Sequence, residues 1–263
     1  ALAAAAAAVT PLPGVTHCYE RVPAGSSSLG HREGPHPAPV FPNLWFTLSE
    51  PAESFDAAFA DVRARLAPHA VTALPATRRY KVDVVFGAAT RAREESVEPG
   101  DPLSADDRRI IGALQGDVAA APDFFAAAAA AAGIPEWKLL ARLEIWRRSG
   151  RLKRVGLVLA HRNAGYTANG MCCWRVDGDT TAVGRALAAR PEVTHCYERP
   201  FAPDFPYNVF AMIHETSVES AVATFAALEG ACALAPGVML LSTTEYKKTS
   251  MTFFAPSGPG SVK

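Results

Sequence analysis

A seven-residue string that occurs twice is the feature that most constrains this chain. The string VTHCYER stands at residues 15–21 and returns unchanged at residues 193–199. Chance duplication of a string that contains His, Cys and Tyr is very rare, so the chain contains two copies of one structural unit. In a strand, alternate residues share a face, so the string brings its His, Tyr and Arg side chains together. A proton donor, a phenol and a fixed cation in one row indicate an anionic ligand.

The segments that follow the string are duplicated as well. Residues 41–46 (FPNLWF) correspond to residues 205–210 (FPYNVF) with one residue of slippage, and RYK at 79–81 corresponds to EYK at 245–247. Between these segments, apolar residues near helical spacing predict one helix in each copy, over residues 53–66 and 217–228. Each copy is therefore expected to contain, in this order, the repeated string, an Asn-containing strand, a helix and a Tyr-Lys strand.

The second copy has two further elements in front of the string. The pattern predicts a strand around residues 155–160 and a short helix around residues 181–189. The resulting order, βαββαβ, is the ferredoxin-like plan. The first copy begins in an Ala-rich stretch where its helix is expected, so its opening strand is missing. We therefore expect a first copy that is truncated at its N-terminus or that depends on another chain there.

The connector between the copies predicts a small helical domain. Residues 87–102 are rich in charge, Gly and Pro, as is typical of a linker, and Ser104 is suited to cap a helix after them. A second helix is predicted from 122 to 132, ending at Gly133, and a third from 135 to 149, ending at Gly150. Three short helices with a Gly-containing turn before the last predict a helix-turn-helix.

The fold class that follows is α+β, with two ferredoxin-like domains and a helix-turn-helix domain between them. The predicted boundaries are residues 1–90 for the truncated domain, 91–102 for the linker, 103–153 for the helix-turn-helix domain, 154–255 for the second ferredoxin-like domain with the main site, and 256–263 for a tail.

Charge and cysteine usage exclude several classes of function. The 26 basic and 26 acidic residues balance, which gives no electrostatic reason to expect nucleic acid or an anionic membrane as the main partner. Uninterrupted apolar runs stay below about 18 residues, so no spanning helix is predicted, and the Ala-rich start lacks the basic lead of a signal peptide. The five cysteines include no CxxC pair. We expect small buried thiols in a reducing cytoplasm.

Several short motifs in the second copy stand in a defined order. They are Gly165-Tyr166, Asn169, Met171 and Trp174 before the string, and Pro206-Tyr207-Asn208, Met212-Ile213-His214 and YKKTSM at residues 246–251 after it. Together with three helices before a ferredoxin-like domain, they resemble the siroheme decarboxylases, a family related to the Lrp/AsnC regulators. The resemblance covers essentially the whole chain, as a fusion of the family's two paired subunit types. It implies self-association or pairing of the two ferredoxin-like halves.

The resemblance also implies a reaction. Two acetate side chains of siroheme, at C12 and C18, are expected to become methyl groups, giving 12,18-didecarboxysiroheme in haem d1 or siroheme-dependent haem biosynthesis. No organic cofactor is implied, and iron enters only as part of the substrate. Siroheme carries eight carboxylates, which Arg can pair bidentately and Lys can meet as a movable charge. The carbon that loses its carboxylate must be protonated, and His is the suitable donor at neutral pH.

Three histidines are candidates for that proton donor, His214, His195 and His161. His214 ends a predicted strand on the parity opposite to the apolar residues that should pack on helices, so it should point to the open sheet face. His195 shares a strand face with Tyr197 and Arg199. Each histidine also has a structural alternative. His214 could make its own hydrogen bonds at the end of a strand, and His195 could order the sheet in both copies. His161 could lie in solvent at the end of a strand.

A larger group of side chains is predicted to anchor or stack on the substrate. This group contains Arg199, Tyr197, Tyr207, Asn208, Tyr246, Lys247, Lys248, Arg162, Trp174, Arg21 and Lys81. Lys247 and Lys248 fall on opposite strand faces, so only one of them can point into a given pocket. Tyr207 and Trp174 have a packing role in the core as their alternative.

The two copies differ at one predicted position of the site. Ser49 stands where the repeat alignment places His214, and Leu44-Trp45 replace Val209-Phe210. We therefore expect the second copy to hold the main catalytic pocket, with the first as a structural partner that contributes Arg21 or Lys81. No Cys or acidic cluster has metal-ligand spacing, so no protein metal site is predicted.

Two other functions remain open from the sequence. The helix-turn-helix allows an Lrp/AsnC-type DNA-binding transcription regulator, although its third helix opens with Pro135-Glu136-Trp137, where polar groups for bases or phosphates are needed. We favour a role for this domain in assembly rather than in DNA binding. A tetrapyrrole-binding sensor or carrier without turnover would use the same anchors as the enzyme.

Overall fold

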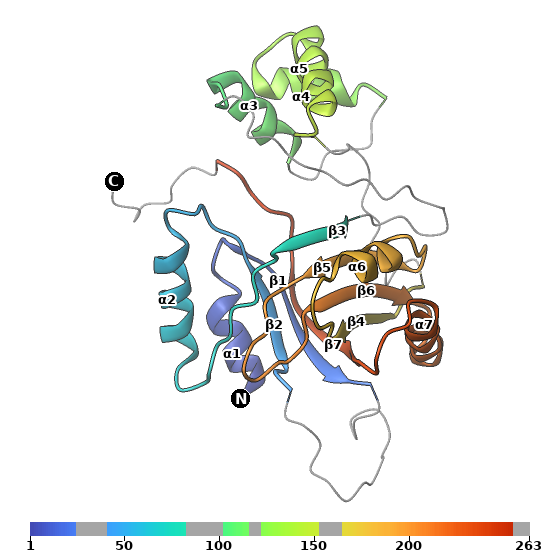
Figure 1. The fold of residues 1–263 in the computed structure, drawn as a ribbon. Coiled ribbons are helices and arrows are strands. Elements are labelled where there is room, and N and C mark those ends of the chain that lie inside the picture. The colour runs from blue at the N-terminus through green and yellow to red at the C-terminus, as the bar shows by residue number, and fades with distance from the viewer. Residues whose placement is uncertain (25–40, 83–101, 116–121, 153–164, 255–263) are drawn as a thin grey trace, which may run out of the picture. The chain divides into compact units, whose positions relative to one another are not determined.

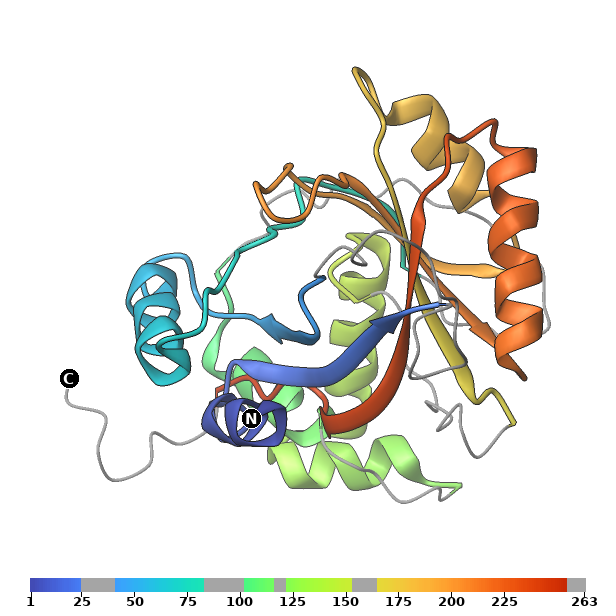
Figure 2. The same ribbon diagram turned by 90° about the horizontal axis from the view of Figure 1, so that it is seen from below.

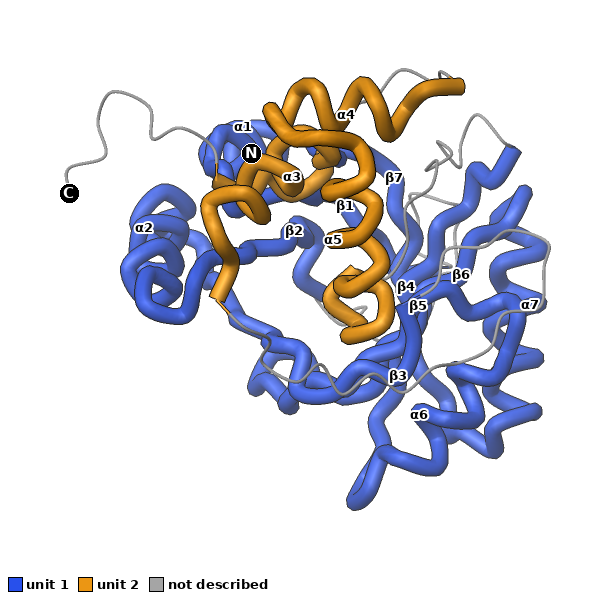
Figure 3. The backbone as a smooth tube through the Cα atoms, turned by 90° about the horizontal axis from the view of Figure 1, so that it is seen from above, with its two compact units in different colours: residues 1–94, 159–248 blue, residues 95–158, 249–263 orange. Residues whose placement is uncertain are grey.

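The chain forms two compact units that are described separately. The computed structural model describes residues 1–24, 41–82, 102–115, 122–152 and 165–254 (Figure 1). The first unit contains residues 1–94 and 159–248, and the second contains residues 95–158 and 249–263 (Figure 3).

One antiparallel sheet organises the first unit. Its strands follow the order β2-β1-β7-β4-β6-β5-β3. They are β1 (Val15–Pro23), β2 (Leu44–Leu48), β3 (Arg78–Val82), β4 (Ala168–Trp174), β5 (Val193–Glu198), β6 (Val209–Glu215) and β7 (Val238–Lys248). The helices of this unit are α1 (Leu2–Val9), α2 (Phe55–Leu66), α6 (Thr181–Ala188) and α7 (Val218–Ala231).

The second copy of the repeat is a complete ferredoxin-like unit, as the sequence predicted. Its elements run β4-α6-β5-β6-α7-β7, and its strands lie in the order β7-β4-β6-β5. The opening strand of this sheet is β4, whereas the sequence suggested residues 155–160, which lie outside the described residues. Asn169-Gly170 resembles a turn signal, yet both residues pair in the middle of the sheet. Gly170 leaves room there for Met239, whose Sδ would lie 2.9 Å from an added Cβ and would have to shift.

The first copy follows the same order from its helix onward: α1, β1, β2, α2 and β3. Its last strand does not return to its own copy. β3 pairs with β5 of the second copy, and β7 of the second copy pairs with β1 as well as with β4 (Figure 2). Each copy thus adds its last strand to the repeated-string strand of the other. The two ferredoxin-like copies are confirmed, and they share one sheet.

Equivalent lysines reinforce this exchange of strands. Lys81 Nζ on β3 donates to the backbone oxygen of Arg190, just beyond α6, at 2.8 Å. Lys247 Nζ on β7 donates to the backbone oxygens of Thr10 and Leu12, just beyond α1, at 2.6 and 3.1 Å. A cation at a helix C-terminus satisfies carbonyl groups that have no intrahelical partner. Each lysine therefore caps a helix of the other copy.

The two faces of the sheet carry different cores. Helices α6 and α7 cover one face, where Trp174, Val209, Ala211 and Ile213 are buried. The opposite face, called the inner face here, carries a cluster that contains Met171, Cys173, Phe205, Phe210 and Leu240. On this face the equivalent residues Phe41 and Phe205 come together, with ring centroids 6.2 Å apart. The two copies therefore meet across the inner face.

The cysteines behave as buried apolar groups, as predicted. Cys18, Cys172, Cys173 and Cys196 are buried and free, and Cys232 is half-buried and free. Burial raises the pKa of the Cys18 thiol to about 11 and that of Cys196 to about 12. These thiols are therefore protonated at neutral pH, and they are poor nucleophiles and poor metal ligands.

The second unit contains the three predicted helices, α3 (Ala105–Leu114), α4 (Phe124–Ala132) and α5 (Glu136–Arg148). Ser104 caps α3 through a reciprocal pair of hydrogen bonds with Asp107, and Gly133 ends α4 at φ +67°, as their positions in the sequence predicted. No single helix in the described ranges is long and apolar enough to cross a membrane. Among the helices of these ranges, only α4 and α5 together, bent by 99°, have the length and composition of a membrane span.

Candidate functional site

The candidate site lies on the inner face, along β5 and β6. On β6, Val209, Ala211 and Ile213 pack under the helices, while Phe210 and Met212 belong to the inner-face cluster. This arrangement confirms the predicted strand parity, and His214 follows Met212 on the same parity. His214 is half-buried at the end of the strand.

Two histidines of the second copy meet at one hydroxyl group. Thr194 Oγ1 lies 3.0 Å from His195 Nδ1 and 3.3 Å from His214 Nδ1. The His195 ring is also stacked on Tyr197, with centroids 6.3 Å apart and planes 21° apart. Both imidazoles are half-buried. The structure therefore brings the predicted proton donors His195 and His214 together.

Arg199 completes the row that begins with His195 and Tyr197. Its guanidinium lies 5.4 Å from the ring centroids of both Tyr197 and Phe210, and it donates to the backbone oxygen of Leu74. Burial lowers the pKa of Arg199, but an arginine in such surroundings remains charged at neutral pH. Within the described ranges, no carboxylate forms an ion pair with Arg199. The guanidinium of Arg199 is thus a half-buried cation whose other N–H groups are suited to bind an anion.

Arg21 is the equivalent residue in the first copy, and it is buried more deeply. It is 6% exposed, lies 5.4 Å from the Tyr19 ring centroid and donates to the backbone oxygen of Leu240 at 3.5 Å. Burial lowers the pKa of Arg21 to about 10, so it too stays protonated at neutral pH. Arg21 and Arg199 both act electrostatically on the Cys173 thiol. The two repeated arginines therefore approach the middle of the sheet from opposite sides.

His17 of the first copy has a different neighbourhood from His195. Thr16 Oγ1 lies 2.9 Å from His17 Nδ1 and 2.9 Å from Thr47 Oγ1. Burial, followed by the positive charge of Lys248, lowers the pKa of His17, and Glu245 opposes this effect. No second histidine joins it from β2.

The strand register confirms the predicted difference between the copies. Val15 pairs with Leu48, and the equivalent Val193 pairs with Ile213. The next residues along β2 and β6, Ser49 and His214, therefore occupy equivalent positions. The first copy has a hydroxyl where the second has an imidazole.

Three predicted anchors lie away from the inner face and need correction. Lys81 and Lys247 cap helices of the opposite copy and cannot reach the row of His195 and Arg199. Tyr246 packs against the apolar core between α1, α2 and the sheet. The reason in each case is the exchange of last strands, which turns these side chains toward the neighbouring copy's helices.

Two more predicted ligand contacts are structural in this fold. Trp174 is fully buried on the helix side, stacked on Phe225 at 5.4 Å, with its Nε1 donating to Glu229 at 3.1 Å. Asn208 is buried, and its amide accepts from the backbone N–H of Val176 at 2.8 Å and donates to the Val176 oxygen at 2.9 Å. Trp174 Nε1 and the Asn208 amide therefore make their hydrogen bonds within the protein.

The remaining predicted residues fall into three groups. Tyr207 lies with the inner-face cluster, in edge-to-face contact with Phe205 at 5.0 Å, and burial raises its pKa. Lys248 pairs with His17 across β7 and β1, so it faces the first copy's row. His161 and Arg162 lie outside the described residues.

Sequence reasoning missed two residues of the site. Thr194 contacts both histidines, and its position inside the repeated string beside His195 was the available signal. Arg79 on β3 pairs with Tyr197 and acts electrostatically on its phenol, because the first copy's last strand lies beside β5. That contact depends on the strand exchange and has no signal in the local sequence.

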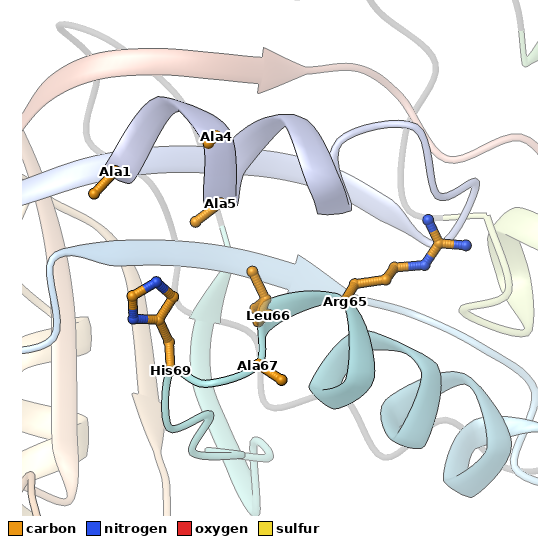
Figure 4. A pocket seen from close by; sticks show the side chains of 7 residues that line it. All are labelled: Ala1, Ala4, Ala5, Arg65, Leu66, Ala67 and His69. Atoms are coloured by element: carbon orange, nitrogen blue, oxygen red, sulfur yellow. The ribbon is translucent and has the colours of Figure 1, made fainter.

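A pocket between α1 and α2 has a different character (Figure 4). It is lined by Ala1, Ala4, Ala5, Arg65, Leu66, Ala67 and His69. These side chains come from helix termini of the first copy and include none of the predicted site residues. In the described ranges, no three His, Cys, Asp or Glu side chains gather as a metal site requires.

Known proteins resemble this chain over most of its length. Residues 163–247 match the family described as the AsnC-like ligand binding domain. A siroheme decarboxylase of Hydrogenobacter thermophilus is 33% identical over 258 residues, covering 94% of this chain and 71% of the relative. The crystal structure of the siroheme decarboxylase NirDL has a TM-score of 0.62 at 28% identity and covers 97% of this chain and 71% of its own. A co-complex of NirDL with an iron-uroporphyrin III analogue has a TM-score of 0.60 at 27% identity and covers 95% and 70%.

Proposed function

The chain belongs to the siroheme decarboxylase family, and we propose that it removes carboxyl groups from siroheme at the inner face of its sheet. The enzyme class is a carbon–carbon lyase, a carboxy-lyase. The acetate side chains at C12 and C18 become methyl groups, and the product is 12,18-didecarboxysiroheme for haem d1 or siroheme-dependent haem biosynthesis. A related protein has been solved with an iron-uroporphyrin III analogue, and this ligand supports a macrocyclic tetrapyrrole as the substrate here.

One observation carries the proposal. Two half-buried imidazoles, those of His195 and His214, lie around one hydroxyl, and Arg199 continues the row with no acidic partner in the described part of the chain. A guanidinium in this position supports pairing with a substrate carboxylate. Each such charged hydrogen bond contributes about 1.5–3 kcal/mol. The half-buried ring of Tyr197 beside it offers a flat surface for the macrocycle.

The reaction needs only a proton from the protein. The bond between the acetate methylene and its carboxylate breaks, carbon dioxide leaves, and the electron pair stays on the carbon attached to the pyrrole. A protonated imidazole of His195 or His214 then delivers a proton to that carbon, and a methyl group results. No electron is gained or lost in this balance. We therefore propose that no organic cofactor takes part and that iron arrives with the substrate.

Mass spectrometry of anaerobic incubations with siroheme tests the proposal. We expect two successive losses of carbon dioxide and a product with two methyl groups in place of acetates. Siroheme that binds, as seen by its absorption spectrum, but keeps its full mass would instead support a sensor or carrier.

The basic side chains of α5 argue against DNA as the ligand. Lys138 and Arg142 pair with Asp106 and Asp107 of α3, and Arg147 and Arg148 both pair with Glu144. Three carboxylates thus offset three of these four positive charges, which leaves little net charge for phosphate binding. We therefore propose an assembly role for this unit and expect no specific shift of DNA in a gel assay.

The proposal also covers the assembly of the protein and its compartment in the cell. The exchange of β3 and β7 supports a pairing of the two ferredoxin-like halves within one chain, in the manner of paired subunits. Further self-association through the second unit is part of the same proposal. The free thiols in the described ranges fit a reducing cytoplasm.

A further inference from the structure

We propose that Thr194 is a positioning residue that fixes the tautomer of His195 and His214, holding a proton on Nδ1 of each ring and leaving Nε2 as the atom that exchanges protons. The inference rests on the proposed function for its catalytic consequence, while the tautomers themselves can be observed without turnover. Thr194 is buried at 4% exposure, so it has no role in direct contact with solvent.

The hydrogen-bond count of a single hydroxyl supports this assignment. Thr194 Oγ1 lies 3.2 Å from the backbone oxygen of Met212, 3.0 Å from His195 Nδ1 and 3.3 Å from His214 Nδ1. A hydroxyl has one proton to donate and two lone pairs to accept with. The Met212 oxygen can only accept, so all three contacts can be hydrogen bonds together only if the hydroxyl proton goes to Met212. Both lone pairs then remain for the rings, and each Nδ1 must carry a hydrogen.

An irregularity in β5 explains how one residue reaches both rings. Adjacent residues in a regular strand point to opposite faces, so Thr194 and His195 should separate. The register shifts between the pairs Val193–Ile213 and His195–Met212, which leaves Thr194 as an extra residue on β5. A bulge of this kind re-aims side chains beside a site. It allows Thr194 and His195 to converge on the same part of β6 as His214.

The tautomer has a direct consequence for proton transfer. A ring that keeps its Nδ1 hydrogen against Thr194 takes up and releases its second proton at Nε2. The two rings then present the same kind of atom to a substrate carbon, and either can act as the donor after protonation. Without the hydroxyl, this constraint on the Nδ1 atom of each ring is lost.

The first copy provides an internal control for this arrangement. Thr16 Oγ1 contacts His17 Nδ1, but its second partner here is the Thr47 hydroxyl, which can either donate or accept. The contacts of Thr16 with His17 and Thr47 therefore leave the direction of its hydroxyl proton open.

The experiment uses ¹⁵N-histidine NMR spectra of the full chain at a pH where the rings are neutral, together with steady-state kinetics. In the wild type, two rings should show a protonated Nδ1 and an unprotonated Nε2. Thr194→Val, which removes the hydroxyl and keeps the shape, should change the tautomer signature of both rings, and Thr194→Ser should restore it. Thr16→Val should alter only the His17 signals.

The kinetic arm separates this inference from the proposed function. For Thr194→Val we expect kcat for siroheme to fall about 10- to 100-fold, with a much smaller change in KM and recovery in Thr194→Ser. Nε2-protonated rings in the wild type, or signals that do not change in Thr194→Val, would overturn the inference whatever the activity. Altered tautomers in a protein that never decarboxylates siroheme would support the inference and remove the proposed function.

Discussion

The two copies of the repeat share one seven-residue string but surround it differently. In the second copy, Thr194 joins His195 to His214, whereas in the first copy Thr16 joins His17 to Thr47. The string alone specifies a strand and a row of side chains. The neighbouring strand, β6 or β2, decides whether that row contains a pair of imidazoles.

Burial adds a second difference between the copies. Arg21 is 6% exposed and packed against Tyr19, while Arg199 is half-buried beside its two aromatic rings. The same residue type therefore stabilises the interior in one copy and remains reachable in the other. We infer from both differences that duplication produced one catalytic row and one supporting row.

Removal of His214 should have the largest effect on activity among the changes that distinguish the two copies. His214→Ala is expected to lower the rate of siroheme decarboxylation about 100-fold or more, because one of two proton donors and its hydrogen bond to Thr194 are lost. His17→Ala, the matched change in the first copy, should lower it less than about 10-fold. Product formation is measured by mass spectrometry. A greater loss from His17→Ala would reverse the assignment of the two rows.

Substrate affinity is the next property that should separate the copies. Arg199→Gln is expected to weaken siroheme binding about 10- to 100-fold, the range of one or two lost charged hydrogen bonds. A titration followed by the siroheme absorption spectrum measures this change. Arg21→Gln should instead lower the midpoint of thermal unfolding, because its guanidinium is buried and bonded to Leu240. Equal affinities for wild type and Arg199→Gln would exclude Arg199 as an anchor.

Local signals in the sequence predicted the features that depend on local physics. Ser104 and Gly133 marked the ends of helices because capping involves only nearby residues. The parity of β6 and the match of Ser49 with His214 also followed from a period of two and an internal alignment. The same parity places His195 and His214 on the inner-face side of β5 and β6.

The errors arose where distant segments meet. Lys81, Lys247 and Tyr246 were predicted to face the substrate, but the exchange of last strands turns them toward helices of the other copy. No local pattern encodes which copy a strand joins. Likewise, the repeated string drew attention to the position of Thr194, but its contact with His214 depends on the bulge in β5.

The strand exchange itself can be tested with its two lysines. Lys81→Met and Lys247→Met should each destabilise the protein by about 1–2 kcal/mol, since each leaves backbone oxygens at a helix end without a donor. Lys81 is 5% exposed, so its loss should have the larger effect. Urea unfolding measures both variants. Wild-type stability in both would show that these caps do not hold the exchanged strands.

The smallest expected effect is a pH dependence of stability that belongs to the first copy. Burial and Lys248 lower the pKa of His17 in the folded protein, while the unfolded chain has a value near roughly 6.5. As pH falls below that value, the unfolded state binds a proton that the folded state refuses, so stability decreases, by at most about 1.4 kcal/mol per pH unit. Above it, both states are neutral and the effect vanishes.

Urea unfolding at pH 7.5 and 5.5 isolates this contribution when the wild type is compared with His17→Gln. The variant should lose less stability on acidification than the wild type, because its side chain cannot take up a proton in either state. The difference should be confined to the acid side of neutrality, which separates it from the carboxylates, since these titrate at lower pH. A variant that loses as much stability as the wild type would show that His17 is protonated equally in the folded and unfolded states. The pKa of His17 would then give no support to the contrast between a buried first row and a reachable second row.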